Sequence, residues 1–282
     1  MDKQLRISLI SLSLSTSLGF LLTLALSSGS TEINGMPILA ICAILAYAIN
    51  YVVFIPSFIA RTEHYFDLAG SITTITLIVY ALVASNERDA RSFIVAVMVL
   101  IWAVRLGSFL FMRAKQTGGD SRFDSVKHRF IPFLSWWSLQ GLWVLMNLAG
   151  ALVILTTEKP ESFGAFAVIG ICLWVLGFAI EVVADQQKKT FRRDNRNDGK
   201  FISTGLWAWS RHPNYFGEIL LWMGIAVMGL PVLSGWRWVA LISPVFVIVL
   251  LTKISGIPIL ERRADKQWSG DPSYAEYVKS TP

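Results

Sequence analysis

Apolar residues in this chain are concentrated in long blocks, separated by short polar segments. Eight stretches are nearly free of charged residues: about 7–27, 37–60, 66–85, 92–112, 132–156, 163–184, 214–231 and 236–253. A helix needs about 20 apolar residues to cross the ~30 Å hydrocarbon core of a bilayer. Because a helix satisfies its own backbone hydrogen bonds in lipid, the pattern predicts an all-α polytopic membrane helix bundle. We expect seven to eight transmembrane helices, since the 214–231 block carries Glu218 and is the weakest candidate.

The basic residues test this arrangement independently. If the N-terminus is cytoplasmic and eight helices cross, 20 of the 25 Lys and Arg residues fall in cytoplasmic segments. Four fall in outer loops, and Arg105 lies inside a helix. This bias follows the positive-inside rule, so we predict an integral membrane protein with both termini and the functional site facing the cytoplasm. An alternative for the first block is a cleaved signal peptide, with Lys3 and Arg6 preceding its apolar core.

Composition agrees with the blocks and excludes several classes of protein. The chain is 54% hydrophobic and 16% charged, whereas ordinary soluble domains are ~45–50% apolar and ~25% charged. A disordered chain is excluded, and a soluble enzyme is disfavoured. The net charge of +6 is explained by topology, so we expect no nucleic-acid partner. Cys42 and Cys172 fall mid-helix and the three histidines are scattered, so we expect no disulfide framework and no metal site.

The chain shows no internal repeat and no low-complexity linker. We therefore expect a single integral membrane domain over residues 1–282, with no obligate protein partner evident. It also lacks a Walker loop and a G-x-G-x-x-G turn after a strand. Any nucleotide cofactor must then be held by helix ends and side chains.

The sixth block continues into a charged segment that ends near residue 193. Glu181, Asp185, Lys188 and Arg192 are spaced four, three and four residues apart, so on a helix they form one stripe. One interpretation is a ladder of intrahelical ion pairs, each worth about 0.2–0.5 kcal/mol. The other is a polar wall of a cofactor pocket, with Arg192 and Arg193 offered to phosphate. The spacing alone favours neither.

A second motif, R-H-P-N-Y at 211–215, precedes the seventh block. Pro213 suits the first turn of a helix, where its missing N–H would be unpaired in any case. Asn214 and Glu218 are four residues apart and share a face. A helix N-terminus has spare N–H donors and a positive dipole end, so it attracts phosphate or carboxylate. The alternative is a capped membrane helix with an interfacial aromatic belt, which does not explain so many polar types in one place.

Two further polar segments are candidates. Residues 61–67 join the second and third blocks, and Glu63 or Asp67 there could act as an acid, since burial raises a carboxyl pKa. A solvated turn is the interpretation favoured by sequence alone. Arg105 needs a partner inside the bundle, and either of those carboxylates is a natural one. The tail carries E-R-R at 261–263, where a solvated amphipathic end competes with a binding role.

The run from Asp185 to Trp222 resembles the C-terminal domain of the steroid 5α-reductase family. The matching features are D-x-x-K-x-x-F/R at 185–192, T-G-L-W at 204–207, R-H-P-N-Y at 211–215 and G-E at 217–218. The chain resembles an uncharacterised bacterial branch of that family more closely. R-H-P-N-Y with an acidic-basic tail also occurs in isoprenylcysteine carboxyl methyltransferases and sterol C14-reductases, so this motif indicates a superfamily.

This resemblance implies a reductase in the bacterial inner membrane that uses NADPH on an α,β-unsaturated ketone of a steroid-like or other apolar lipid. Residues 1–112 would form the lipid-substrate side and 113–282 the cofactor side. A donor must stabilise charge on the carbonyl oxygen during hydride addition. Glu63, Tyr65 and Arg105 are the catalytic candidates, although Thr62 and Trp102 stand where the family has Gln and Tyr. The cofactor candidates are Asp185, Lys188, Lys189, Arg192, Arg193, Lys200, Arg211, His212, Asn214, Tyr215, Glu218, Glu261 and Arg262.

Two other functions remain open from the sequence. One is an S-adenosylmethionine-dependent membrane methyltransferase of the isoprenylcysteine type, since R-H-P-N-Y is neutral between the two activities. The cationic stripe at 185–193 favours the phosphate-rich dinucleotide. The other is a non-catalytic transporter or scaffold, against which stand the few intramembrane charges and the lack of paired broken helices.

Overall fold

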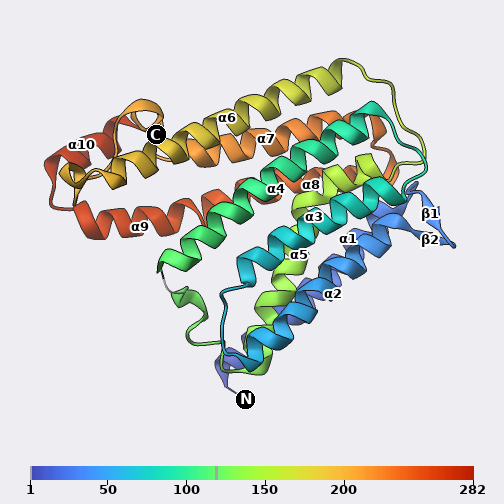
Figure 1. Cartoon of the computed structure of the whole chain (residues 1–282), viewed down its shortest axis with the longest axis horizontal. Coiled ribbons are helices and arrows are strands. Elements are labelled where there is room, and N and C mark those ends of the chain that lie inside the picture. The colour runs from blue at the N-terminus through green and yellow to red at the C-terminus, as the bar shows by residue number, and fades with distance from the viewer. Residues whose placement is uncertain (1, 118–119) are drawn as a thin grey trace. The chain divides into compact units, whose positions relative to one another are not determined.

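The structure is a computed structural model of the chain, and it describes residues 2–117 and 120–282. Figure 1 shows that it consists almost entirely of helices, which confirms the predicted all-α class. The α-helices are α1 (Lys3–Ser27), α2 (Ile38–Ile59), α3 (Phe66–Ala84), α4 (Ala90–Thr117), α5 (Phe130–Leu155), α6 (Ala165–Arg193), α7 (Pro213–Gly229), α8 (Ile242–Val249), α9 (Ile257–Trp268) and α10 (Pro272–Ser280).

Short elements connect these helices. Strands β1 (Glu32–Ile33) and β2 (Met36–Pro37) form an antiparallel hairpin, and Asn34 and Gly35 between them take positive φ angles of 52° and 76°. Such angles suit the tight turn of a two-residue hairpin loop. The short 3₁₀-helices are η1 (Ser121–Phe123), η2 (Asn195–Asn197), η3 (Gly205–Ala208), η4 (Leu230–Val232) and η5 (Gly235–Leu241), and η6 (Leu250–Ile254) is π-helical.

Eight segments of the described chain are long and apolar enough to cross a membrane. The polytopic bundle predicted from the sequence is therefore confirmed, with eight candidate spans. The weakest predicted block corresponds to α7 with η4, and it qualifies as a span over Pro213–Val232. The last span, Gly235–Trp268, joins η5, α8, η6 and α9.

The chain divides into two compact units, which are described separately. Unit 1 comprises Met1–Gly164 and Gly229–Ser243, and unit 2 comprises Ala165–Met228 and Pro244–Pro282. The single membrane domain expected from the sequence stays a prediction. The catalytic candidates Glu63, Tyr65 and Arg105 belong to unit 1, whereas every cofactor candidate belongs to unit 2.

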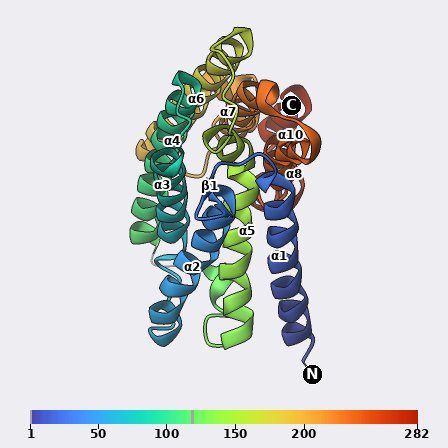
Figure 2. The same cartoon turned by 90° about the vertical axis from the view of Figure 1, so that its right-hand side faces the viewer.

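Helix α5 is the centre of unit 1. It packs against α1, α2, α3 and α4, and Figure 2 shows it between α1 and α2. Small residues allow this close approach. A Cβ added at Gly141 would lie 3.0 Å from the Tyr47 ring of α2. Tyr47 in turn donates a 2.6 Å hydrogen bond to the Ser15 carbonyl of α1, so three helices meet at one aromatic side chain.

Unit 2 depends on backbone contact between α6 and α7. A Cβ added at Gly217 would lie 2.5 Å from the carbonyl oxygen of Gly177, and one at Gly224 would lie 2.6 Å from that of Gly170. Both helices repeat glycine every seven residues, so their backbones can touch along one line. This contact aligns the polar C-terminal part of α6 with the N-terminus of α7, where the candidate residues lie.

Candidate functional site

The R-H-P-N-Y motif spans the end of the segment before α7 and the first residues of α7. That segment begins at Gly205, whose backbone is in the left-handed conformation. Gly205 has a φ of 64°, and a Cβ there would lie 2.6 Å from the Gln187 side chain of α6. Glycine is required for both reasons. Gln187 accepts a 3.0 Å hydrogen bond from the Leu206 N–H, which fixes η3 against α6. Helix α7 then begins at Pro213, as predicted.

Glu261 of α9 joins the two residues that precede α7. One carboxylate oxygen pairs with Arg211, and the other lies 2.6 Å from Nε2 of His212. The backbone N–H of Arg211 also donates a 2.8 Å bond to the carbonyl of Pro282. The tail therefore fixes the orientation of Arg211 and His212. The sequence placed Glu261 among the binding candidates but gave no sign of this bidentate contact.

Burial lowers the pKa of His212 below its usual value of 6.5, and the hydrogen bond to Glu261 only partly offsets this effect. At neutral pH the imidazole is therefore uncharged. A neutral imidazole carries one N–H, and with Glu261 as acceptor the proton lies on Nε2. The lone pair on Nδ1 is then available as a hydrogen-bond acceptor.

The predicted stripe of α6 faces this segment. Asp185 accepts a 3.2 Å hydrogen bond from the Asn214 side-chain amide. One turn later, the Lys188 ammonium lies 4.4 Å from the centre of the Trp207 ring, a cation–π contact. Glu181 is buried, at 4% exposure, on the part of α6 that packs on Gly217. Three residues of the stripe, Glu181, Asp185 and Lys188, therefore contact other parts of unit 2, whereas Arg192 is exposed.

Three buried polar atoms of the motif have no hydrogen-bond partner among the described residues: Nε of Arg211, Nδ1 of His212 and Oδ1 of Asn214. Buried polar atoms are normally satisfied, so each such atom needs an explanation. One is a donor and two are acceptors. A nicotinamide dinucleotide carries amide, hydroxyl and phosphate groups that match both kinds, so these residues fit such a cofactor.

The remaining cofactor candidates lie at the margin of this site. Tyr215 stacks on His212 with ring centres 5.8 Å apart, and Glu218 is half-buried one turn into α7. Arg262 is exposed and donates a hydrogen bond to Pro258 of its own helix. Four other cofactor candidates are exposed cations at the end of α6 or in the loop that follows it: Lys189, Arg192, Arg193 and Lys200.

Sequence reasoning missed an aromatic cluster that holds the loop before the motif. The Phe201 ring stacks on Tyr277 of α10 at 5.3 Å and also contacts Trp268 and Tyr274. Tyr277 donates a 2.6 Å hydrogen bond to the carbonyl of Trp207. The two tyrosines, three residues apart, were the available signal, although a solvated tail explained them equally well.

The catalytic candidates of unit 1 have different environments. Glu63 is buried, at 6% exposure, and accepts hydrogen bonds from the Asp120 N–H at 2.9 Å and the Lys127 ammonium at 3.3 Å. Tyr65 is exposed at the start of α3, and Arg105 is half-buried on α4. Asp120 and Lys127 were not among the predicted residues, because contacts across 57 and 64 positions leave no local pattern.

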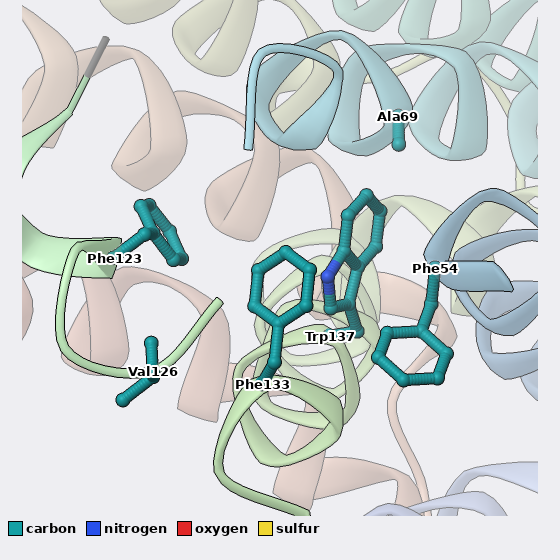
Figure 3. Packing of buried hydrophobic residues seen from close by; sticks show 6 residues of the cluster. All are labelled: Phe54, Ala69, Phe123, Val126, Phe133 and Trp137. Atoms are coloured by element: carbon teal, nitrogen blue, oxygen red, sulfur yellow. The ribbon is translucent and has the colours of Figure 1, made fainter. Parts of the chain in front are cut away.

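Unit 1 also holds an apolar cluster, which includes Phe123 and Val126 from the segment that precedes Lys127. Figure 3 shows Phe133 and Trp137 of α5 between Phe123 on one side and Phe54 on the other. The ring centres of Phe123 and Phe133 are 6.1 Å apart, and those of Phe54 and Trp137 are 6.4 Å apart. Aromatic rings in tilted and edge-on contact present flat apolar faces to one another.

Comparison with known proteins places these features in a family. Residues 53–281 match a family described as "Protein of unknown function (DUF1295)". An uncharacterized protein of Schizosaccharomyces pombe is 26% identical over 171 residues, 51% of this chain and 50% of that protein. Steroid 5-alpha-reductase DET2 of Gossypium hirsutum is 33% identical over 82 residues, 29% of this chain and 30% of the reductase.

The chain thus spans half the length, or less, of these curated relatives. No solved structure matches it significantly. The eight candidate spans indicate an integral membrane protein, and part of the chain is similar to a steroid 5-alpha-reductase.

Proposed function

We propose that this chain, which belongs to the DUF1295 family over most of its length, is an NADPH-dependent membrane reductase, because part of it is similar to a steroid 5-alpha-reductase. Its substrate would be an α,β-unsaturated ketone in a lipid of the 3-oxo-Δ4-steroid type. The observation that carries the proposal is the meeting of Arg211, His212, Asn214, Asp185 and Glu261 within unit 2, with unsatisfied polar atoms among them.

Different residues of unit 2 would bind different parts of the cofactor. The exposed cations Lys189, Arg192 and Arg193 would bind phosphate, since arginine presents a planar fork that matches phosphate oxygens. The free oxygen of the Asn214 amide would accept a hydrogen bond from the nicotinamide carboxamide. Glu261 would hold Arg211 in the required orientation. Bound NADPH supplies a hydride to the β-carbon of the enone.

The carbonyl oxygen of the substrate gains negative charge in this reaction and needs a hydrogen-bond donor. Glu63, Tyr65 and Arg105 are the proposed catalytic residues from the sequence. All three belong to unit 1, which also holds the aromatic cluster of Figure 3.

The orientation in the membrane is also part of the proposal. The charge bias of the loops supports cytoplasmic termini and a cofactor site open to the cytoplasm, in a bacterial inner membrane. NADPH is charged and cannot cross the bilayer, so it must reach the site from the aqueous side where it is made. The lipid substrate would enter from the bilayer.

Ligand titration of the detergent-solubilised protein tests the proposal. We expect NADPH to raise the melting temperature, as any ligand that binds only the folded state does. Asn214→Ala should raise the Kd for NADPH about tenfold, because losing one hydrogen bond to a buried polar group costs about 1–2 kcal/mol. The exposed Asn195 offers a matched control, and Asn195→Ala should bind like the wild type.

Other outcomes point to the other functions. If S-adenosylmethionine raises the melting temperature and NADPH does not, the chain is a methyltransferase and the reductase proposal fails. If neither ligand shifts it, a transporter or scaffold role gains support.

A further inference from the structure

Unit 1 contains an apolar cavity of about 580 Å³ that has no part in the proposed reaction. Its wall is formed by residues of α1, α5 and η5 and by Ile242, and every one of them is apolar or aromatic. All of these residues belong to unit 1. Sites for small molecules usually have volumes of about 300–1,000 Å³, so the cavity is large enough for an apolar molecule or part of one.

The wall on α1 opens toward the surroundings of the protein. Leu18, Leu22 and Ala25 line the cavity and are spaced four and three residues apart, so they share one face of the helix. Leu21 and Leu24 also line it, and they are 58% and 56% exposed. Helix α1 is the least buried of the eight candidate spans. In a membrane its surroundings are hydrocarbon, so the cavity is continuous with the lipid-facing surface.

The opposite wall shows how deep the cavity lies. Leu142 is at the middle of α5, which packs beside α1 (Figure 2), and Met146 is one turn further on. Trp236 of η5 lines the other end and is 73% exposed. Tryptophan is typical of the boundary between membrane and water. The cavity therefore extends from the middle of a span to its end, which is about half of a ~30 Å bilayer core. One acyl chain of one leaflet has this length.

Polar contacts close the end of the cavity at Trp236. The Thr31 N–H donates a 2.7 Å hydrogen bond to the Thr156 carbonyl, which joins the segments that follow α1 and α5. Arg237 donates a 3.0 Å hydrogen bond to the Thr157 hydroxyl. This arginine is 5% exposed, and its Nε has no hydrogen-bond partner among the described residues. Its charge, which Glu158 partly balances, suits a phosphate at this end, because charges interact strongly where the dielectric constant is low.

We propose that this cavity binds one acyl chain of a phospholipid from the leaflet around the C-terminal ends of α1 and α5. The phosphate of the lipid would lie at the end marked by Trp236 and Arg237. The inference does not rest on the proposed function, since α1 precedes residue 53, where the family match begins. A chain bound there would fill the space between α1 and α5 and supply dispersion contacts to both helices. Bound lipid should therefore stabilise unit 1.

Photocrosslinking of the wild type tests the site without any variant. The full-length protein is freed of lipid in detergent and titrated with a phosphatidylglycerol that carries a diazirine on one acyl chain. After irradiation, peptide mass spectrometry should find saturable crosslinks at Leu22 and Met146, at one lipid per chain, that excess unlabelled phosphatidylglycerol removes. Crosslinks spread evenly over the exposed faces of the spans would overturn the proposal, because lipid in general contact with the protein gives that pattern.

A variant that fills the cavity gives a second test. Ala25→Phe places a ring inside it, and the Kd for phosphatidylglycerol should rise at least about tenfold, the effect of excluding two methylenes. Ala48→Phe adds the same ring at an exposed alanine of α2 and is the matched control, which should bind lipid like the wild type. Native mass spectrometry measures both affinities. Equal lipid binding by Ala25→Phe and the wild type overturns the proposal.

Other occupants have their own signatures. If a 3-oxo-Δ4-steroid displaces the crosslinked lipid from Leu22 and Met146, the cavity is a site for that steroid and the acyl-chain proposal fails. If the wild type is a dimer that Ala25→Phe converts to a monomer, a second copy of the chain covers the cavity and the proposal also fails. A protein that binds lipid here but does not bind NADPH upholds this inference while the proposed function falls.

Discussion

Glu63 in unit 1 and Glu261 in unit 2 each join two distant parts of the chain through a carboxylate, but their surroundings differ. Each accepts contacts from two groups far away in the sequence: Asp120 and Lys127 for Glu63, Arg211 and His212 for Glu261. Glu63 borders a cluster of aromatic rings, and each of its two oxygens accepts one hydrogen bond. Glu261 borders a group in which polar atoms remain unsatisfied.

This difference separates two tasks. The aromatic rings beside Glu63 are buried against one another, so they stabilise the packing of unit 1. A polar group with spare donors and acceptors, beside exposed cations, suits a charged nucleotide. The contrast predicts that changes in unit 1 alter stability and enone chemistry, whereas changes in unit 2 alter nucleotide affinity.

The largest expected effect is in the aromatic cluster of unit 1. Phe123→Ala removes a ring that is 1% exposed, and large-to-small core substitutions of this kind cost about 3–5 kcal/mol. Denaturation of the solubilised protein by sodium dodecyl sulfate measures the loss. Phe163→Ala, at a residue 47% exposed in a loop, is the control and should cost little. Equal losses in both variants would show that Phe123 is not an anchor.

The next effect is in the contact between α6 and α7. Gly217→Ala would place a methyl group 2.5 Å from the Gly177 carbonyl, and overpacking of this kind costs about 1–3 kcal/mol. Because the contact aligns Asp185 with Asn214, NADPH affinity should fall as well. Gly270→Ala meets nothing within 4 Å and should be neutral in both measurements. A Gly217→Ala protein with wild-type melting temperature would contradict this packing.

A smaller effect is expected at the contact of Glu261 with Arg211 and His212 in unit 2. Glu261→Gln keeps the shape of the side chain but removes the charge that pairs with Arg211, at a cost of about 1–2 kcal/mol. Calorimetric titration should show weaker NADPH binding, by about tenfold. Glu276→Gln changes an exposed glutamate of α10 and serves as the control. Unchanged affinity in Glu261→Gln would show that Arg211 needs no support from the tail.

The smallest effect concerns pH. The pKa of His212 is lower in the folded state than its ordinary value of 6.5, so the unfolded chain binds more protons between the two values. The stability that neutral His212 provides is therefore present above about pH 6.5 and is lost as the pH falls below it. The melting temperatures of the wild type and His212→Gln should converge on acidification. Divergence would contradict the shift, and His128→Gln, at an exposed histidine, is the control.

Much of the fold was readable from the sequence because the bilayer imposes a strong pattern. All eight predicted apolar blocks correspond to candidate spans, and Pro213 starts a helix where its missing N–H costs nothing. The stripe from Glu181 to Arg192 lies on one helix, as its spacing predicted. These features are local, so neighbouring residues carry the signal.

The contacts that build the site were harder to predict, because they are long-range. Lys127 lies 64 residues from Glu63, and Glu261 lies 50 from Arg211. No periodicity links such positions. Trp207 and Tyr277 lie 70 positions apart, and their hydrogen bond depends on how α10 folds back. The catalytic and cofactor roles of the predicted residues remain proposals.

Hydrogen–deuterium exchange with and without saturating NADPH tests the central claim most directly. The claim is that unit 2 holds the nucleotide through the segment before α7 and its partners in the tail. Amide exchange in residues 199–212 should slow when NADPH is added, because the ligand would satisfy Arg211 and His212 and order the loop. Exchange that is unchanged by NADPH, or that slows only with S-adenosylmethionine, would contradict the account.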